Sequence, residues 1–154
     1  MKPTFTIYVD GASRGNPGPA GAGIYVVHNE KPIIQEGFYL GKTTNNQAEY
    51  LALVLALLAV KKLCHDEKIE QPHLTIISDS ELMIKQLKGL YSVKNEILKQ
   101  LKNIVDDQLK TTVYQCRHVL REHNKHADAL ANQGIDKKQK IPTSFTKILS
   151  HYGL

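Results

Sequence analysis

The sequence predicts a mixed α/β (α+β) fold in which one five-stranded sheet is flanked by helices. Three observations lead to this prediction. The chain opens with three segments that are rich in β-forming residues and joined by short links, and such strands pair as an antiparallel meander. A long apolar segment of helical composition follows them. Two further strand-like segments then alternate with helical ones, which is typical of strands that join a sheet in parallel.

The three opening strands are predicted from their composition and from the turn residues between them. Residues 4–9 (TFTIYV) consist mainly of β-formers. Residues 11–19 are rich in Gly, Pro and Asn, which predicts a turn. Residues 23–28 and 33–40 form the next two strands, and the segment 28–32 between them predicts a hairpin loop.

The middle of the chain predicts the buried centre of the fold. Residues 45–62 have the length and composition of a helix that is apolar nearly all round, and such a helix is buried. Residues 74–78 (LTIIS) form a continuous β-branched, apolar run. A run of this kind predicts a buried strand that is parallel to its neighbours and lies near the sheet centre.

Shorter elements and a tail complete the chain. Residues 1–136 are predicted to form a single domain, and residues 137–154, which carry four lysines, a basic C-terminal tail that either docks or stays mobile. The remaining elements of the domain are a helix over 80–87 stopped by Gly89, a helix over 95–109, a strand over 112–120 and a helix over 124–133 with Gly134 as its expected C-cap.

Composition narrows the function classes. The formal net charge of +5 is compatible with a polyanionic partner. Cys64 and Cys116 lie far apart and form no Cys-x-x-Cys pair, so a zinc site or a thioredoxin-type redox site has no support. The longest apolar stretch, residues 51–60, is about half of a membrane span. With no signal-like N-terminus, we expect a cytoplasmic monomer that does not enter membranes.

Four acidic residues occupy positions where α/β sheets build sites. Asp10 and Asp79 end two predicted strands, and Glu49 and Asp128 lie in the first turns of two predicted helices. Each acid is embedded in apolar sequence, where an isolated carboxylate would be costly to desolvate. A shared divalent cation would offset that cost, and Mg²⁺ prefers carboxylate oxygens together with water and phosphate.

Each acid also has a simpler interpretation. Asp10 suits a Gly-containing turn, and Asp79 suits a helix N-cap. Glu49 and Asp128 suit first-turn positions that the helix dipole favours. The spacing alone therefore leaves two interpretations of the four acids: a shared metal site, or separate turn and helix-cap roles.

Four local motifs resemble those of the type 1 ribonuclease H family, in the family's order and over about residues 5–134. The first and second are long and specific, whereas the third alone is weak. The motifs are residues 8–21 (YVDGASRGNPGPAG), 43–49 (TTNNQAE), 78–80 (SDS) and 121–131 (REHNKHADALA).

The resemblance implies a chemistry for the four acids. Asp10, Glu49, Asp79 and Asp128 match the family's catalytic and metal-binding carboxylates, with two Mg²⁺ or Mn²⁺ ions per active site when substrate is bound. The implied reaction is hydrolysis of the RNA strand of an RNA/DNA hybrid, giving 5′-phosphate and 3′-hydroxyl ends.

The resemblance also implies the residues that contact the hybrid. Polar groups on tight turns can reach phosphates and 2′-hydroxyls, and 2′-hydroxyl contacts distinguish RNA from DNA. Turn and cap chemistry is the alternative role for the asparagines. The implied substrate-binding residues are Gly11, Ser13, Asn16, Asn45 and Asn46, and His123 and Asn124 are candidates for an auxiliary role.

The chain departs from the best-known bacterial pattern in three places. Only residues 89–94 separate two helices where a lysine-rich protrusion would stand. The loop before Asp128 is the short segment 120–124, without the usual Gly-His context. Glu81 follows the third motif where Gln is common. This compact pattern resembles the archaeal-type branch of the family.

Three functions stay open at this point. The first is a metal-dependent endonuclease acting on RNA/DNA hybrids. The second is a hybrid-binding accessory module with weak or lost nuclease activity, which the missing protrusion favours and the four retained acids disfavour. The third is a broader nuclease that also cleaves double-stranded RNA, because both duplexes present an A-form-like groove.

Overall fold

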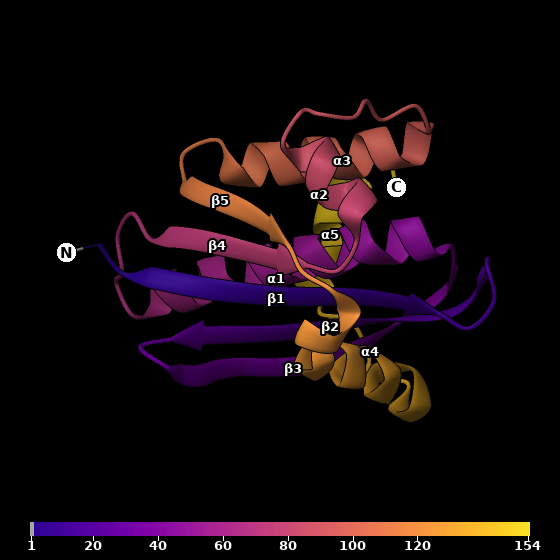
Figure 1. Cartoon of the computed structure of the whole chain (residues 1–154), viewed down its shortest axis with the longest axis horizontal. Coiled ribbons are helices and arrows are strands. Elements are labelled where there is room, and N and C mark those ends of the chain that lie inside the picture. Colours follow the sequence, from indigo (N-terminus) through magenta and orange to yellow (C-terminus); the bar gives the residue numbers. More distant parts are fainter. Residues whose placement is uncertain (1) are drawn as a thin grey trace.

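The computed structural model describes residues 2–154 and contains one five-stranded sheet with helices on both faces (Figure 1). The strand order is β3-β2-β1-β4-β5, and the sheet is mixed, which confirms the predicted fold class. The elements are β1 (Thr4–Ser13), β2 (Gly18–His28), β3 (Lys31–Thr43), α1 (Asn45–Asp66), β4 (His73–Ser78), α2 (Glu81–Leu87), α3 (Glu96–Leu109), β5 (Val113–His118), the short 3-10 helix η1 (Arg121–His123), α4 (Lys125–Lys137) and α5 (Thr143–His151).

The antiparallel half of the sheet extends further than the sequence predicts. Ser13 pairs with Ala20 and Gly18 pairs with Thr43, so the ladder continues through residues 11–13 and 18–19. The prediction of a turn over 11–19 is wrong at both ends because cross-strand pairing overrides the local preference of Gly and Pro. The predicted hairpin loop after β2 is confirmed, and it narrows to a two-residue turn.

The parallel half brings two strand ends together. β4 pairs in parallel with both β1 and β5, which confirms the prediction of a parallel strand near the centre. The register aligns Tyr8 with Ile77. The two residues that follow these partners, Val9-Asp10 and Ser78-Asp79, therefore lie side by side at the same edge of the sheet.

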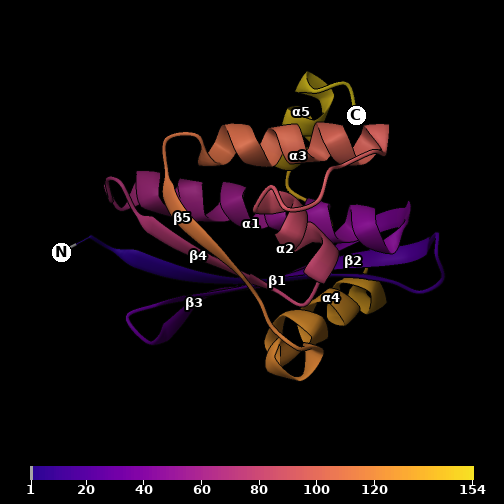
Figure 2. The same cartoon turned by 45° about the horizontal axis from the view of Figure 1, so that its top comes forward.

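Helix α1 is the centre of the core. It lies between the sheet and α3 (Figure 2), and side chains on nearly all of its sides are buried. The Thr44 hydroxyl accepts a hydrogen bond from the Gln47 backbone N–H and so caps the helix start. The helix runs to Asp66, four residues beyond the predicted end, because Val60 and Cys64 still face the core.

Helix α4 covers the opposite face of the sheet, over β1, β2 and β3. The prediction that Gly134 caps this helix is wrong, since the helix continues to Lys137 and Lys138 adopts the left-handed cap conformation. Gly134 serves close packing instead. A Cβ at this position would lie 2.5 Å from the backbone nitrogen of Phe38 on β3.

The segment predicted as a basic tail contains α5, which docks on α1. Phe145 is its anchor, because its side chain is 2% exposed and joins the main core. None of the helices within residues 2–154 combines the length and the apolar character that a membrane span requires.

Candidate active site

Three of the four predicted acids converge at the edge of the sheet. One carboxylate oxygen each from Asp10, Glu49 and Asp79 lies within 4.8 Å of the other two. Asp10 comes from β1, Glu49 from the first turns of α1, and Asp79 from the end of β4. Asp128, on α4, lines the same cleft, whose volume is about 500 Å³. The structure thus brings together the four acids that sequence reasoning selected.

Gly11 allows Asp10 and Glu49 to approach so closely. A Cβ at Gly11 would lie 2.2 Å from the backbone carbonyl carbon of Ala48 and 2.3 Å from the backbone nitrogen of Glu49. These separations are far below van der Waals contact, so no other residue fits here without moving α1. The Gly11 N–H also donates a hydrogen bond to the Glu49 carboxylate. The backbone of β1 therefore orients the second acid of the site.

Burial and mutual repulsion favour the protonated forms of these acids. Asp10 is 5% exposed and Glu49 is 7% exposed. Burial, followed by the charges of Glu49 and Asp79, raises the pKa of Asp10 to about 9. Burial is also the main cause that raises the pKa of Glu49 to about 8, against the Gly11 hydrogen bond, which lowers it. Without a cation, the ionised forms of Asp10 and Glu49 are therefore disfavoured in this pocket.

Arg121 enters the site from η1, a position that was not predicted from the sequence. Its guanidinium lines the cleft and lies 3.5 Å from the Asp128 carboxylate. Burial raises the pKa of Asp79, and the charge of Arg121 acts against that rise. The signal in the sequence was its position in the fourth motif, seven residues before Asp128.

Most of the predicted substrate-binding residues surround the acids. Gly11, Ser13, Asn45 and Asn46 line the cleft. Asn16 does not line it, but its side-chain oxygen accepts a hydrogen bond of 3.0 Å from the Asn45 backbone N–H. The Asn45 side chain in turn accepts one of 3.2 Å from the Ser13 N–H. The turn after β1 and the start of α1 are thereby held to each other.

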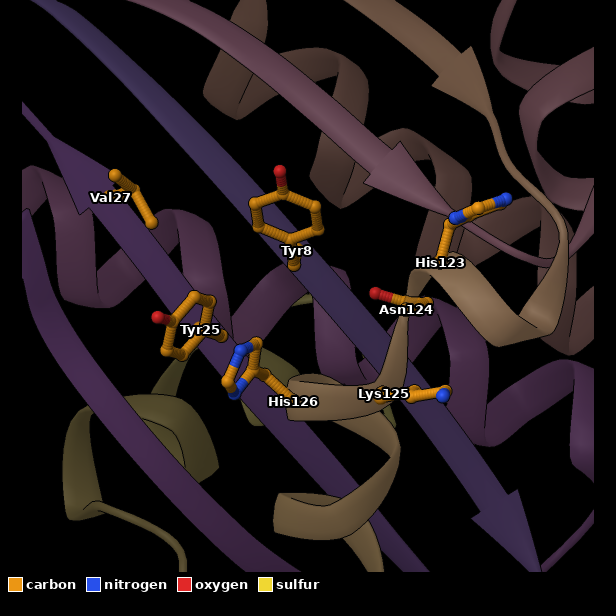
Figure 3. A pocket seen from close by; sticks show the side chains of 7 residues that line it. All are labelled: Tyr8, Tyr25, Val27, His123, Asn124, Lys125 and His126. Atoms are coloured by element: carbon orange, nitrogen blue, oxygen red, sulfur yellow. The ribbon is translucent and has the colours of Figure 1, made fainter. Parts of the chain in front are cut away.

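The two candidates for an auxiliary role lie elsewhere. His123 and Asn124 line a separate cavity with Tyr8 and Tyr25 (Figure 3) rather than the carboxylate cleft. Asn124 is buried, and its side-chain N–H donates a hydrogen bond of 2.8 Å to the Val9 carbonyl oxygen. It supports the backbone next to Asp10 rather than facing the acids.

The donor set fits a divalent cation. Hard cations such as Mg²⁺ take carboxylate oxygens, and a cluster of three oxygens within 4.8 Å of one another supplies them from three rigid elements. The raised pKa values of Asp10 and Glu49 also indicate a cation site, because a bound cation would favour the ionised carboxylates.

Comparison with known proteins agrees with this geometry. The RNase H family model matches residues 2–136. Ribonuclease HI of Halobacterium salinarum is 40% identical over 132 residues, which are 84% of this chain and 63% of that protein. A bifunctional protein of Mycobacterium tuberculosis is 33% identical over 135 residues, 84% of this chain but 35% of that protein. The chain thus spans less than two thirds of the length of these curated relatives.

Solved structures give the same result. LC11-RNase H1, crystallised in complex with an RNA/DNA hybrid, is 35% identical, with a TM-score of 0.81 over 86% of this chain and 97% of that one. RNase H1 of Halobacterium salinarum is 35% identical, with a TM-score of 0.79 over 87% of this chain and 98% of that one. On these matches and on its four-acid cleft, the chain belongs to the ribonuclease H family.

Proposed function

We propose that the chain is a metal-dependent endonuclease that hydrolyses the RNA strand of RNA/DNA hybrids. The observation that carries the proposal is the convergence of Asp10, Glu49 and Asp79 within 4.8 Å, with Asp128 on the same cleft. The cleft lies at the molecular surface, so a phosphodiester of a duplex can reach it. A similar protein, LC11-RNase H1, was crystallised in complex with an RNA/DNA hybrid, and this supports the choice of duplex.

The four carboxylates would hold two Mg²⁺ or Mn²⁺ ions in this proposal. Bound there, such ions supply an activated water for in-line attack on phosphorus and stabilise the departing 3′ oxygen. The expected products carry a 5′-phosphate and a 3′-hydroxyl. Glu49, oriented by the Gly11 N–H, and Asp10, fixed at a strand end, give the ligand set its rigidity.

The polar turns beside the acids would select the substrate. Ser13, Asn45 and Asn46 line one side of the cleft, where their N–H and O–H groups can reach phosphates and 2′-hydroxyls. Asn16 fixes the turn from behind through the Asn45 N–H. Arg121 lies on the side of Asp128, where its guanidinium can hold a phosphate oxygen.

A substrate panel tests the proposal. Labelled RNA/DNA hybrid, double-stranded RNA, single-stranded RNA and double-stranded DNA of one sequence are incubated with Mg²⁺, with Mn²⁺ and with chelator. We expect internal cuts in the RNA strand of the hybrid, in metal only, with 5′-phosphate ends. Equal cutting of double-stranded RNA would identify the broader nuclease. Hybrid binding without cleavage in either metal would identify the accessory module and contradict the proposal.

A further inference from the structure

A second cavity, of about 300 Å³, lies next to the carboxylate cleft and has no part in the proposed chemistry. It opens between the start of α4 and the strands β1 and β2 (Figure 3). Tyr8 and Asp10 are two residues apart on β1, so their side chains point to the same face of the sheet. The cavity and the cleft are therefore neighbours along one strand.

One wall of this cavity carries a hydrogen-bond acceptor without a partner. Asn124 is 1% exposed, and its side-chain N–H is used by the Val9 carbonyl. Its side-chain oxygen has no hydrogen-bond partner among the described residues 2–154. Figure 3 shows this oxygen on the side of Asn124 that faces Tyr8. A buried acceptor of this kind favours a ligand that donates an N–H or O–H group.

The floor of the cavity is aromatic. Tyr8 and Tyr25 are cross-strand partners whose ring centroids are 5.9 Å apart. His126 already stacks on Tyr25, with ring centroids 4.3 Å apart and planes inclined by 8°. Planar heterocycles stack on tyrosine and histidine rings with little dependence on their identity. The acceptor and the rings together suit a nucleobase, which is planar and carries N–H donors on its edge.

The rim of the cavity suits a phosphate. Lys125 and His123 lie on the side away from Val27 in Figure 3, and no carboxylate is among the lining residues. Within residues 2–154, Lys125 forms no salt bridge, so its ammonium group is available to a ligand. A lysine ammonium binds phosphate as a point charge. The volume is at the lower end of the range for small-ligand sites, as one nucleotide requires.

We propose that this cavity binds a single unpaired nucleotide, with the base between Tyr8, Tyr25 and Asn124 and the phosphate at Lys125. Two sources offer the same chemistry: a free nucleoside monophosphate, and an unpaired nucleotide at the end of a duplex held in the carboxylate cleft. The site is separate from the metal-binding acids, so occupancy does not require cleavage. Its link to the cleft is Asn124, which also holds the backbone beside Asp10.

The first experiment titrates the ¹⁵N-labelled full chain with adenosine monophosphate in chelator and follows its NMR spectrum. We expect saturable shifts at the backbone amides of Tyr8 and Tyr25 and at the Asn124 side-chain amide, with smaller shifts at Glu49. Tyr25→Leu should weaken binding at least about fivefold, because base stacking is lost. Tyr114→Leu, at an exposed tyrosine on β5 outside the cavity, is the matched control and should bind normally.

A second variant separates the phosphate contact from the base contact. Lys125→Gln should weaken binding of adenosine monophosphate but leave adenosine binding unchanged, whereas Lys110→Gln should change neither. Ribose 5-phosphate, which lacks the base, should cause no saturable shift at Asn124. If adenosine monophosphate causes no saturable shifts up to about 10 mM, or if well-folded Tyr25→Leu and Lys125→Gln bind it like the wild type, the proposal is overturned.

Binding of two hybrids in chelator identifies the source of the nucleotide. If one unpaired adenosine increases affinity over a blunt hybrid, and Tyr25→Leu removes the increase, the duplex end supplies the nucleotide. If free nucleotide binds and the overhang adds nothing, the free nucleotide is the ligand. Both results support the site. Neither binding assay involves turnover. Their results can therefore be interpreted even if the proposed nuclease function proves wrong.

Discussion

Asp10 shows how burial and neighbouring charges can make a single carboxylate unfavourable for folding. Its carboxylate is buried beside Glu49 and Asp79, and its pKa is raised to about 9 by that burial and by those charges. In the absence of a cation the ionised form is therefore disfavoured in the folded protein. The same arrangement that would attract a divalent ion reduces the stability of the metal-free chain.

The first prediction concerns stability without metal. In chelator, Asp10→Asn should raise the free energy of unfolding at pH 8 by at least about 1 kcal/mol, roughly the free energy of one pKa unit. The sign follows from proton binding. Because the pKa values of Asp10 and Glu49 are raised in the folded state, from 3.8 to about 9 and from 4.5 to about 8, the folded protein holds more protons than the unfolded chain between these limits. This contribution makes stability fall as pH rises from about 4 to about 9.

Urea denaturation at a series of pH values measures this effect. The wild type should lose stability across the window, and Asp10→Asn should lose less. Asp66→Asn removes an exposed acid at the end of α1 and serves as the control, with little change expected. If Asp10→Asn is less stable than the wild type in chelator, the carboxylates of Asp10, Glu49 and Asp79 do not repel one another as inferred here.

The second prediction concerns Arg121, on the wall of the cleft. It is largely exposed and lies 3.5 Å from Asp128, so its contribution to folding is below about 1 kcal/mol. From its place on the cleft wall, we expect a larger effect on the proposed reaction. Arg121→Gln should lower kcat/KM on hybrid about tenfold with unchanged stability. Arg117→Gln, an exposed arginine on β5 outside the cleft, should change kcat/KM far less. Equal losses of kcat/KM in the two variants would show that the net positive charge matters and that the position of Arg121 does not.

At the scale of elements, the contact between β1 and α1 determines whether the acids meet. Gly11 makes that contact, because a Cβ there would lie 2.2 Å from the α1 backbone. Gly11→Ala should therefore shift α1 away from β1, with a loss of about 1–3 kcal/mol of stability and of most activity. Gly89→Ala is the comparison. Apart from its chain neighbours, no atom of the described residues 2–154 lies within 4 Å of a Cβ there, and only its positive φ adds strain. Thermal unfolding and hybrid cleavage distinguish the two. Normal activity of Gly11→Ala would contradict this role.

Some features of the helices and strands could be predicted from the sequence, and others could not. The order of strands and helices, the buried α1 and the parallel β4 follow from periodicity and composition. The extension of β1 through Ser13 does not, because it depends on pairing with Ala20 across the sheet. In the sequence alone, Gly134 looks like the end of a helix. Only its close contact with Phe38 in the folded structure explains why a glycine lies inside α4. Arg121 was visible as a motif residue, but its direction toward Asp128 requires the turn of η1.

At the scale of the whole molecule, α5 extends the core beyond the region that the family model matches. That region ends at residue 136, and Phe145 on α5 is buried against the core formed by α1. Phe145→Ala should destabilise the protein by about 3–5 kcal/mol through the cavity it leaves. Lys147→Ala on the exposed side of the same helix should have little effect. Urea denaturation measures both. Equal stability of Phe145→Ala and wild type would mean that α5 does not dock in solution.

The proposed function is that the cleft of Asp10, Glu49, Asp79 and Asp128 cleaves the RNA strand of a hybrid. The most direct measurement is cleavage of a labelled RNA/DNA hybrid with Mg²⁺ and with Mn²⁺ by the wild type, Asp10→Asn and Asp66→Asn. We expect internal RNA cuts by the wild type and Asp66→Asn, and a loss of activity of at least about 100-fold for Asp10→Asn. Undiminished cleavage by well-folded Asp10→Asn would contradict it.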